Sequence, residues 1–200
     1  MEMSDPNIGG KLLLHACCAP CAEYPVYDLF SGGVTPDVIY YNPNIHPRYE
    51  FERRREQLVK LGQIYDLKCF YSEDFRMGDW LSKSWEGQFD SRCDMCYFIR
   101  MDHVARFAKE HGYDAFTTSL LVSPYQQHDK IRMMASDAAQ KYGVRFAYTD
   151  WRPNFRKGQD MAREHGLYRQ KYCGCIYSLE DSKFREKIVR DFPASWEDER

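Results

Sequence analysis

The sequence lacks the features that would place the protein in a membrane or send it out of the cell. Its first residues, MEMSDPNIGG, are polar and show no basic start followed by an apolar run, so they do not resemble a secretion signal. No stretch approaches the roughly 20 apolar residues that a membrane-spanning helix needs. The sequence therefore predicts a cytoplasmic protein without a membrane partner.

An excess of charge of one sign is also missing. The formal net charge is −2 over 200 residues, so no overall basic field indicates nucleic-acid binding, and any basic surface must be local. Residues 152–171 form one such segment, with six basic and two acidic side chains. A solvated surface and a phosphate-facing patch are equally compatible with this composition.

Internal repeats and low-complexity segments are absent, and the length favours a single domain. Short apolar runs, expected to be strands, alternate with segments of helical periodicity. The expected strands cover residues 11–15, 38–41, 67–71, 115–121 and 144–148, and the expected helices cover 20–30, 48–65, 93–111 and 131–142. This alternation predicts a three-layer α/β domain with a mostly parallel sheet. We expect residues 11–150 to form the core and residues 151–200 a small helical or irregular C-terminal extension.

Cysteine is plentiful. Because the cytosol is reducing, eight cysteines indicate metal or redox chemistry more than a disulfide framework. Seven of them fall into three groups, namely Cys17-Cys18 with Cys21, Cys93-x-x-Cys96, and Cys173-Gly174-Cys175. Cys69 stands alone in the apolar run LKCFY and is predicted to be a buried core thiol.

Two of the groups have the form of metal-ligand pairs. Cys93 and Cys96 have the spacing by which one turn of chain presents two thiolates to one centre, although a redox dithiol has the same spacing. Cys17 and Cys18 can share a centre only if the chain turns there, because adjacent residues of a strand point to opposite faces. Four thiolates from two distant segments match both tetrahedral zinc and a four-iron cluster.

The third group, Cys173-Gly174-Cys175, would close a tight ring if it were oxidised. Strained bridges of this kind are comparatively easy to reduce. The pair could therefore store or relay electrons. Extra metal ligands and inert thiols remain the alternatives.

Five motifs occur in order over most of residues 12–178. They are LLHACCAPC, YYNPNIHPRYEFERR, RCDMCYFIRMDHVA, FTTSLLVSPYQQHDKI and YRQKYCGC. With this set, the sequence resembles the QueH-type epoxyqueuosine reductases. The resemblance implies a domain similar to the HUP (adenine nucleotide alpha hydrolase-like) fold. It also implies a [4Fe-4S] cluster on Cys17, Cys18, Cys93 and Cys96, with an additional iron for which Cys21 is the candidate ligand.

The resemblance also implies a reaction. Epoxyqueuosine at the wobble position of tRNA is reduced to queuosine, the final step of queuosine biosynthesis. Cys173 and Cys175 would form a redox-active disulfide that takes part in catalysis. The implied partners are tRNA with epoxyqueuosine in the anticodon and an unidentified low-potential electron donor.

Side chains for the proton transfer and for the base are less clearly marked. His15, His46, Tyr125 and His128 lie in the motifs, and a structural role is preferred for each of them. Aromatic residues make up 16% of the chain, which suits a stacked RNA base. The candidates for that lining are Tyr40, Tyr41, Tyr168 and Tyr172, with ordinary packing as the alternative for each.

Two other functions make different demands on the sequence. An ATP-using tRNA-modification enzyme would need a phosphate loop, SGG-x-D-S, directly after the first strand, where this chain has CCAPC. That loop is absent, which excludes the ATP-using class. A non-catalytic zinc-binding RNA module remains as the alternative, because four cysteines suit it equally, but it leaves Cys173 and Cys175 without a purpose.

Overall fold

The computed structural model describes residues 10–72 and 75–191. Within them, five strands form one sheet in the order β3-β2-β1-β4-β5, and every neighbouring pair is parallel. The strands are β1 Leu12–His15, β2 Asp37–Tyr40, β3 Cys69–Tyr71, β4 Ala115–Thr118 and β5 Arg145–Phe146. The predicted parallel α/β sheet is confirmed.

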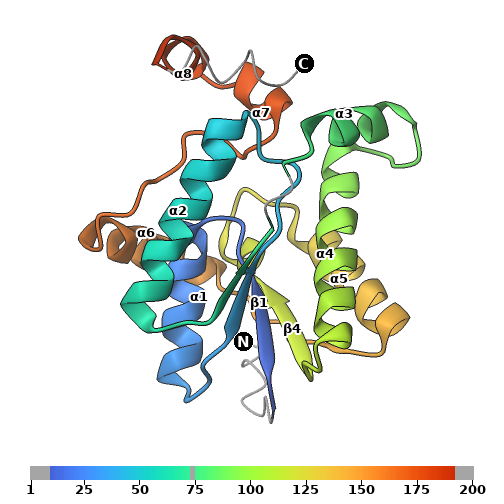
Figure 1. The fold of residues 1–200 in the computed structure, drawn as a ribbon, viewed down its shortest axis with the longest axis vertical. Coiled ribbons are helices and arrows are strands. Elements are labelled where there is room, and N and C mark those ends of the chain that lie inside the picture. Colours follow the sequence, from blue (N-terminus) through green and yellow to red (C-terminus); the bar gives the residue numbers. More distant parts are fainter. Residues whose placement is uncertain (1–9, 73–74, 192–200) are drawn as a thin grey trace.

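Helices cover the sheet on both faces, and Figure 1 shows α1 and α2 on one side and α4 and α5 on the other. The α-helices are α1 Ala19–Ser31, α2 Arg48–Tyr65, α3 Met77–Trp85, α4 Arg92–Glu110, α5 His128–Tyr142, α6 Phe155–Glu164, α7 Ile176–Glu180 and α8 Arg185–Asp191. Two 3-10 helices lie between them, η1 Ser119–Val122 and η2 Arg152–Asn154.

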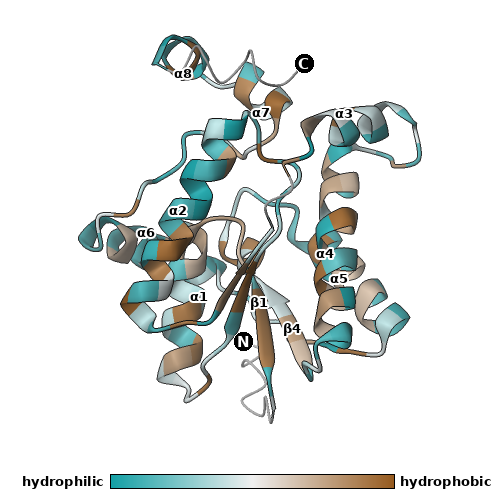
Figure 2. Ribbon diagram, in the orientation of Figure 1, coloured by the Kyte–Doolittle hydropathy of each residue, from teal (hydrophilic) through white to brown (hydrophobic). Residues whose placement is uncertain are grey.

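The alternation of side chains along the strands builds the two halves of the core. Leu14, Val38 and Tyr40 share one face of the sheet and pack in the same apolar cluster as residues of α2. Leu13 and Phe116 lie in the cluster that includes α4 and α5. Figure 2 shows the resulting hydrophobic colouring concentrated in the central strands.

The central strand β1 has β2 on one side and β4 on the other, so the strand order reverses at its carboxyl end. In open parallel sheets, ligands bind in the crevice at such a reversal. The chain turns there, because β1 ends at His15 and Cys18 is already the N-cap residue of α1. The fold therefore places the first cysteine group at the expected binding edge.

Some elements differ from the sequence prediction. The strand expected over residues 115–121 ends at Thr118, whose hydroxyl accepts a hydrogen bond from the backbone N–H of Leu120 and starts η1 instead. Helix α3 was not predicted, and it is held to the domain by Trp80, which is 2% exposed. Cys69 is only half-buried, because β3 is the edge strand of the sheet.

The C-terminal part is helical, as predicted, in α6, α7 and α8. Helix α6 packs closely on α1 at Gly158, where a Cβ atom would lie 2.9 Å from the Cβ of Tyr24. A domain boundary at residue 150 stays a prediction. The polar N-terminal residues 1–9 and the end of the expected extension, residues 192–200, lie outside the described residues. No helix in the described ranges is long and apolar enough to cross a bilayer.

Candidate metal and redox site

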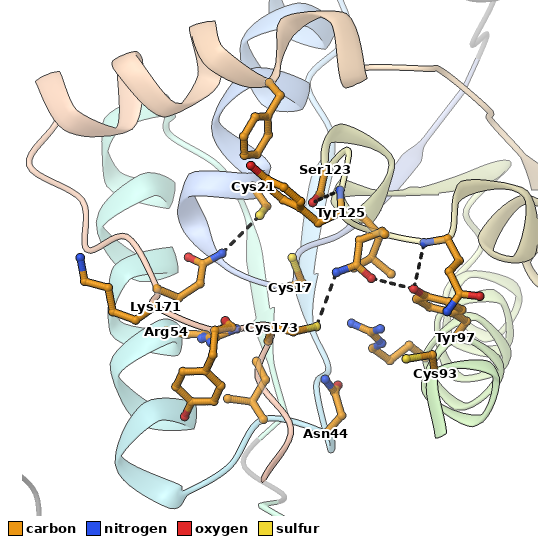
Figure 3. Close-up of a pocket in the computed structure, with 18 of the residues that line it drawn as sticks. Cys17, Cys21, Asn44, Arg54, Cys93, Tyr97, Ser123, Tyr125, Lys171 and Cys173 are labelled. Carbon is orange, nitrogen blue, oxygen red and sulfur yellow. Dashed lines mark hydrogen bonds between the residues drawn. The ribbon is translucent and has the colours of Figure 1, made fainter. Parts of the chain in front are cut away.

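A cavity of about 460 Å³ opens beyond the carboxyl end of β1 and collects cysteines from distant parts of the chain (Figure 3). Segments from all five motifs contribute to its wall. The cysteines in its lining are Cys17, Cys21, Cys93 and Cys173. The sheet reversal, two helix N-termini and the Cys-Gly-Cys segment therefore meet at one site.

The first group forms a compact triad. The Sγ atoms of Cys17, Cys18 and Cys21 all lie within 4.8 Å of one another, and Cys17 and Cys18 are 3.8 Å apart. Cys18 is the N-cap residue of α1, where the chain leaves β1 and enters the helix, and at this junction its sulfur comes close to that of Cys17. Cys21 follows one turn later. The predicted turn between strand and helix is what makes this arrangement possible.

Hydrogen bonding shifts the pKa values of the three thiols of this triad in different directions. The thiols of Cys18 and Cys21 hold the pKa of Cys17 well below its usual range, although burial opposes them. Burial raises the pKa of Cys18 well above its usual range, and the hydrogen bond to Cys17 does the same for Cys21. Ser119 also donates to the Cys17 sulfur at 3.5 Å. Hydrogen bonds from two thiols and a hydroxyl therefore favour the thiolate form at Cys17.

This donor set fits a metal centre. Two sulfurs bound to one tetrahedral ion at about 2.3 Å lie roughly 3.8 Å from each other, and Cys17 and Cys18 already have that separation. Thiolates suit zinc and iron–sulfur clusters. The triad could therefore bind a metal with little rearrangement.

The second group lies at the start of α4. Ser91 caps this helix by accepting a hydrogen bond from the backbone N–H of Asp94, and Cys93 and Cys96 follow in its first turns. Cys93 lines the cavity, whereas Cys96 is buried in a small core with Trp80 and Cys175. Burial raises the pKa of Cys96 to about 12. The predicted ligand set of Cys17, Cys18, Cys93 and Cys96 stays a prediction, because the sulfur group found among the described residues is Cys17, Cys18 and Cys21.

The third group carries one exposed and one buried sulfur. Cys173 is exposed in the cavity, and Gln126 donates to its sulfur at 3.5 Å. Cys175 is buried. Both are free thiols in this structure, so the implied disulfide would be their oxidised form and stays a prediction. Gly174, between them, has φ of +145°, a conformation that side chains rarely adopt.

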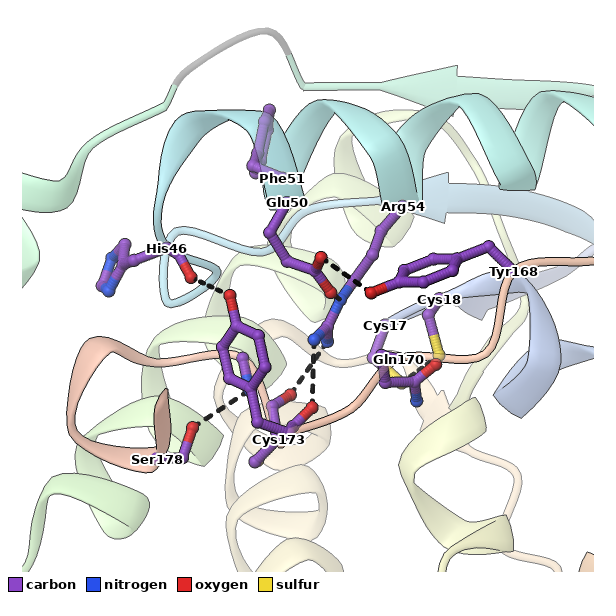
Figure 4. Close-up of polar contacts among 12 residues, drawn as sticks. Cys17, Cys18, His46, Glu50, Phe51, Arg54, Tyr168, Gln170, Cys173 and Ser178 are labelled. Carbon is purple, nitrogen blue, oxygen red and sulfur yellow. Dashed lines mark hydrogen bonds and ion pairs between the residues drawn. The ribbon is translucent and has the colours of Figure 1, made fainter. Parts of the chain in front are cut away.

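A buried arginine holds the backbone of this segment (Figure 4). Arg54, 2% exposed, donates from Nη1 to the carbonyl of Cys173 at 2.9 Å and from Nη2 to the carbonyl of Tyr172 at 3.0 Å. Its Nε donates to Glu50 at 2.7 Å, and the hydroxyl of Tyr168 donates to the other carboxylate oxygen of Glu50 at 3.1 Å. A network of hydrogen bonds around the buried Arg54–Glu50 ion pair therefore fixes the loop that carries Cys173.

Several polar contacts of the cysteines were not predicted from the sequence. Ser119, Gln126 and Gln170 each donate to a cysteine sulfur, at 3.5 Å in every case. Arg100 is buried, lines the cavity and donates from Nε to the carbonyl of Cys96 at 3.0 Å. All four residues lie in the motifs. Ser119, Gln126 and Gln170 contact cysteines that are far away in sequence, which periodicity cannot reveal.

The three candidate histidines occupy structural positions. His15 accepts from Thr118 at Nδ1 and donates from Nε2 to the carbonyl of Tyr41, because a carbonyl can only accept. Burial lowers the pKa of His15 and of His46 to about 4. His128 pairs with a tyrosine hydroxyl. None of the three histidines lines the cavity among the described residues.

Some of the candidate tyrosines line the cysteine cavity, and the others pack elsewhere in the fold. Tyr125 is 83% exposed and lines the cavity, as does Tyr172. Tyr40 is a core residue whose hydroxyl donates to a backbone carbonyl of α2. Tyr41 stacks on the ring of His103 at 3.5 Å, and Tyr168 lies under Arg53 beside a second cavity.

Comparison with known proteins identifies the relatives of this chain. The family model for epoxyqueuosine reductase QueH matches residues 12–181. The chain is 38% identical to the epoxyqueuosine reductase QueH of Dehalococcoides mccartyi over 168 residues, covering 84% of this chain and 92% of that protein. It is 33% identical to the protein of the same name from Haemophilus influenzae, covering 92% of this chain and 78% of that protein.

A solved structure supports the fold class. The U34-tRNA thiolase NcsA of Methanococcus maripaludis, solved with its [4Fe-4S] cluster, superposes with a TM-score of 0.54 at 14% identity. The match covers 94% of this chain and 68% of the thiolase. That similarity shows a shared fold of the HUP class, which confirms the fold implied by the motifs.

Proposed function

Because this chain belongs to the epoxyqueuosine reductase QueH family, we propose that it reduces epoxyqueuosine to queuosine at the wobble position of tRNA. This is the final step of queuosine biosynthesis. The reaction converts an epoxide to an alkene, and it consumes two electrons and two protons and releases one water. Membership of this family supports an oxidoreductase role, and the cysteine-lined cavity offers thiols for a reduction.

The cofactor that we propose is a [4Fe-4S] cluster held by Cys17, Cys18, Cys93 and Cys96, with Cys21 as a ligand of an additional iron. Such a cluster supplies electrons one at a time. The compact sulfur triad and the presence of Cys93 in the same cavity support this proposal. The buried guanidinium groups of Arg54 and Arg100 supply positive charge beside the thiolates.

We propose that the thiols of Cys173 and Cys175 supply the electrons and protons that the reaction consumes. Closing two thiols into a disulfide releases two electrons and two protons, which equals what the epoxide takes up on losing its oxygen as water. An external low-potential donor must then reduce the disulfide again. The exposure of Cys173 in the cavity supports its contact with the substrate. Gln126 donates a hydrogen bond to the Cys173 sulfur and so helps to orient it in the cavity.

The substrate base must leave its loop to reach the cavity. Enzymes that act on a base turn it out of the stack, and unpaired RNA bases are held by stacking and edge hydrogen bonds. The cavity offers rings and amides for this purpose, including Tyr97, Tyr125 and Gln126. Tyr97 donates to Gln126 at 2.8 Å, so these two side chains are held in fixed orientation.

The observation that carries the proposal is the meeting of the sulfur triad and the exposed thiol of Cys173 in one cavity. A zinc-binding RNA module would use the triad but would have no role for that thiol.

Anaerobic purification separates the two functions. We expect a brown protein with iron and sulfide that, once reduced, converts epoxyqueuosine in tRNA to queuosine, detected by mass spectrometry of the nucleosides. A colourless protein with stoichiometric zinc and no conversion would instead support the binding module.

A further inference from the structure

A second cavity, of about 520 Å³, adjoins the cysteine cavity. It lies between α2, the segment that leads to the Cys-Gly-Cys loop, and α8. Lys171 lines both cavities, so the two are neighbours along the same wall. A polymer that places one unit in the first cavity has an adjacent unit within reach of the second.

Positive charge dominates this second cavity. Four cations line it, and among the described residues none of the four has a carboxylate as an ion-pair partner. They are Arg53, Arg169, Lys171 and Lys187. The acidic residue in the lining, Asp191, pairs with Arg190 at 3.2 Å. The cavity is therefore suited to an anion such as a phosphate.

Aromatic rings lie among these cations. The guanidinium of Arg53 stacks 3.5 Å above the ring of Tyr168, and the ammonium of Lys171 lies 5.4 Å from the ring of Phe184. The ring of Tyr168 is held in place because its hydroxyl donates to the buried Glu50. Rings and guanidinium planes that are already ordered are suitable platforms for stacking a base.

We propose that this second cavity binds a nucleotide of the substrate RNA next to the base that enters the cysteine cavity. The cations would hold its phosphate, and the planes of Tyr168, Phe184 and Arg53 would stack its base. An acidic peptide would match the charge but would leave the ring faces without a purpose. This inference rests on the proposed function, because it takes the RNA as the molecule in the first cavity.

Binding of an unmodified anticodon stem–loop RNA tests the site without catalysis. The test variant is Arg169→Gln with Lys187→Gln, two exposed cations of the cavity. The matched control is Lys60→Gln with Lys109→Gln, two exposed cations on α2 and α4 that line neither cavity. Fluorescence anisotropy across a salt series would give the affinity and its salt slope for each protein.

We expect the test variant to bind roughly tenfold more weakly at low salt, with a salt slope smaller by about 1.4, the value for two single-strand phosphate contacts. The control should match the wild type. Phe184→Leu, which keeps an apolar side chain but removes the ring, should bind roughly fivefold more weakly with an unchanged slope.

An unchanged affinity in the double variant would overturn the site, and so would an equal loss in the control, which would show diffuse charge attraction. Reduction of epoxyqueuosine by the wild type is measured separately. A wild type that shows this binding pattern but leaves epoxyqueuosine intact would reject the reductase function and leave the nucleotide site standing.

Discussion

The buried guanidinium of Arg54 donates a hydrogen bond to the backbone carbonyl of Cys173 at 2.9 Å, across 119 residues of sequence. This contact connects the helix that follows β2 with the Cys-Gly-Cys loop. Since Glu50 neutralises the arginine at 2.7 Å, the loop is held by a charge that is itself paired. The position of the exposed Cys173 thiol therefore depends on an ion pair that lies outside the triad of Cys17, Cys18 and Cys21.

The first prediction concerns this ion pair. Arg54→Met leaves Glu50 as an unpaired buried carboxylate, which should cost about 3–5 kcal/mol of the free energy of unfolding. Adding Glu50→Met removes the unpaired charge and should recover much of that stability. The carbonyls of Tyr172 and Cys173 still lack a donor in the double variant, so turnover should stay low. Urea unfolding and turnover in the two variants measure both effects, and full turnover in the double variant would refute the positioning role.

A second prediction concerns the cluster ligands. Cys18→Ser or Cys96→Ser should abolish assembly of an intact cluster, because each removes one of the four proposed thiolate ligands. Iron and sulfide per chain are the readout. A Cys96→Ser protein that retains four irons and four sulfides would remove Cys96 from the ligand set.

The half-buried Cys69 provides the matched control. It lies on the edge strand β3, outside the cavity lining. Cys69→Ala should leave iron content and turnover unchanged and lower stability by roughly 1 kcal/mol through lost packing. Loss of activity in a folded, iron-replete Cys69→Ala protein would assign this thiol a function.

The third prediction separates electron transfer from metal binding. If Cys173 and Cys175 are redox groups, replacing either with Ser should spare the iron content but stop or severely slow single-turnover reduction. Gly174→Val should also slow it, because φ of +145° disfavours a side chain and the new Cβ would lie 3.2 Å from Arg54 and Ile45. Iron lost in step with activity in the Cys→Ser proteins would show that these sulfurs are ligands.

A fourth prediction follows from His46. Its Nε2 donates to the carbonyl of Pro43 and its Nδ1 accepts from the backbone N–H of Ile176, so the ring is neutral. The folded pKa of about 4 lies below the unfolded value near 6.5. The contribution of the neutral His46 ring to the free energy of unfolding is therefore fully present above about pH 6.5, and it is lost as the pH falls towards 4.

Protonation of His46 should lower the free energy of unfolding by roughly 2 kcal/mol between about pH 7 and pH 5. His46→Gln cannot titrate in this range, so its free energy of unfolding should fall less over the same interval. Urea denaturation at the two pH values compares the variants. Equal pH dependence in both proteins would show that His46 is not the group that takes up the proton.

The sequence predicts the elements that local patterns encode. The boundaries of α2 match its apolar periodicity, and the turn at Cys17 and Cys18 follows from the strand that ends at His15. Cysteine spacing identified the groups but not their packing, since Cys21 joins Cys17 and Cys18 while Cys96 is buried beside Cys175.

Contacts between residues that are far apart in the chain could not be predicted from the sequence. Of the basic segment 152–171, Arg152 and Arg163 pair with acidic neighbours within three residues, at 2.7 and 2.9 Å, so a carboxylate lies beside each of these charges. Arg169 and Lys171 instead line cavities. Local charge counts could not separate these two kinds of basic residue, because the difference lies in tertiary packing.

The most direct test of the proposed reductase function is the yield of queuosine in a single turnover as a function of iron content. Anaerobic protein reconstituted to graded iron levels, then reduced, is mixed with tRNA that carries epoxyqueuosine, and the nucleosides are analysed by mass spectrometry. We expect conversion that rises in proportion to iron, with loss of one oxygen from the base, and no conversion by Cys18→Ser. Conversion that is independent of iron, or iron-replete protein that leaves epoxyqueuosine unchanged, would contradict it.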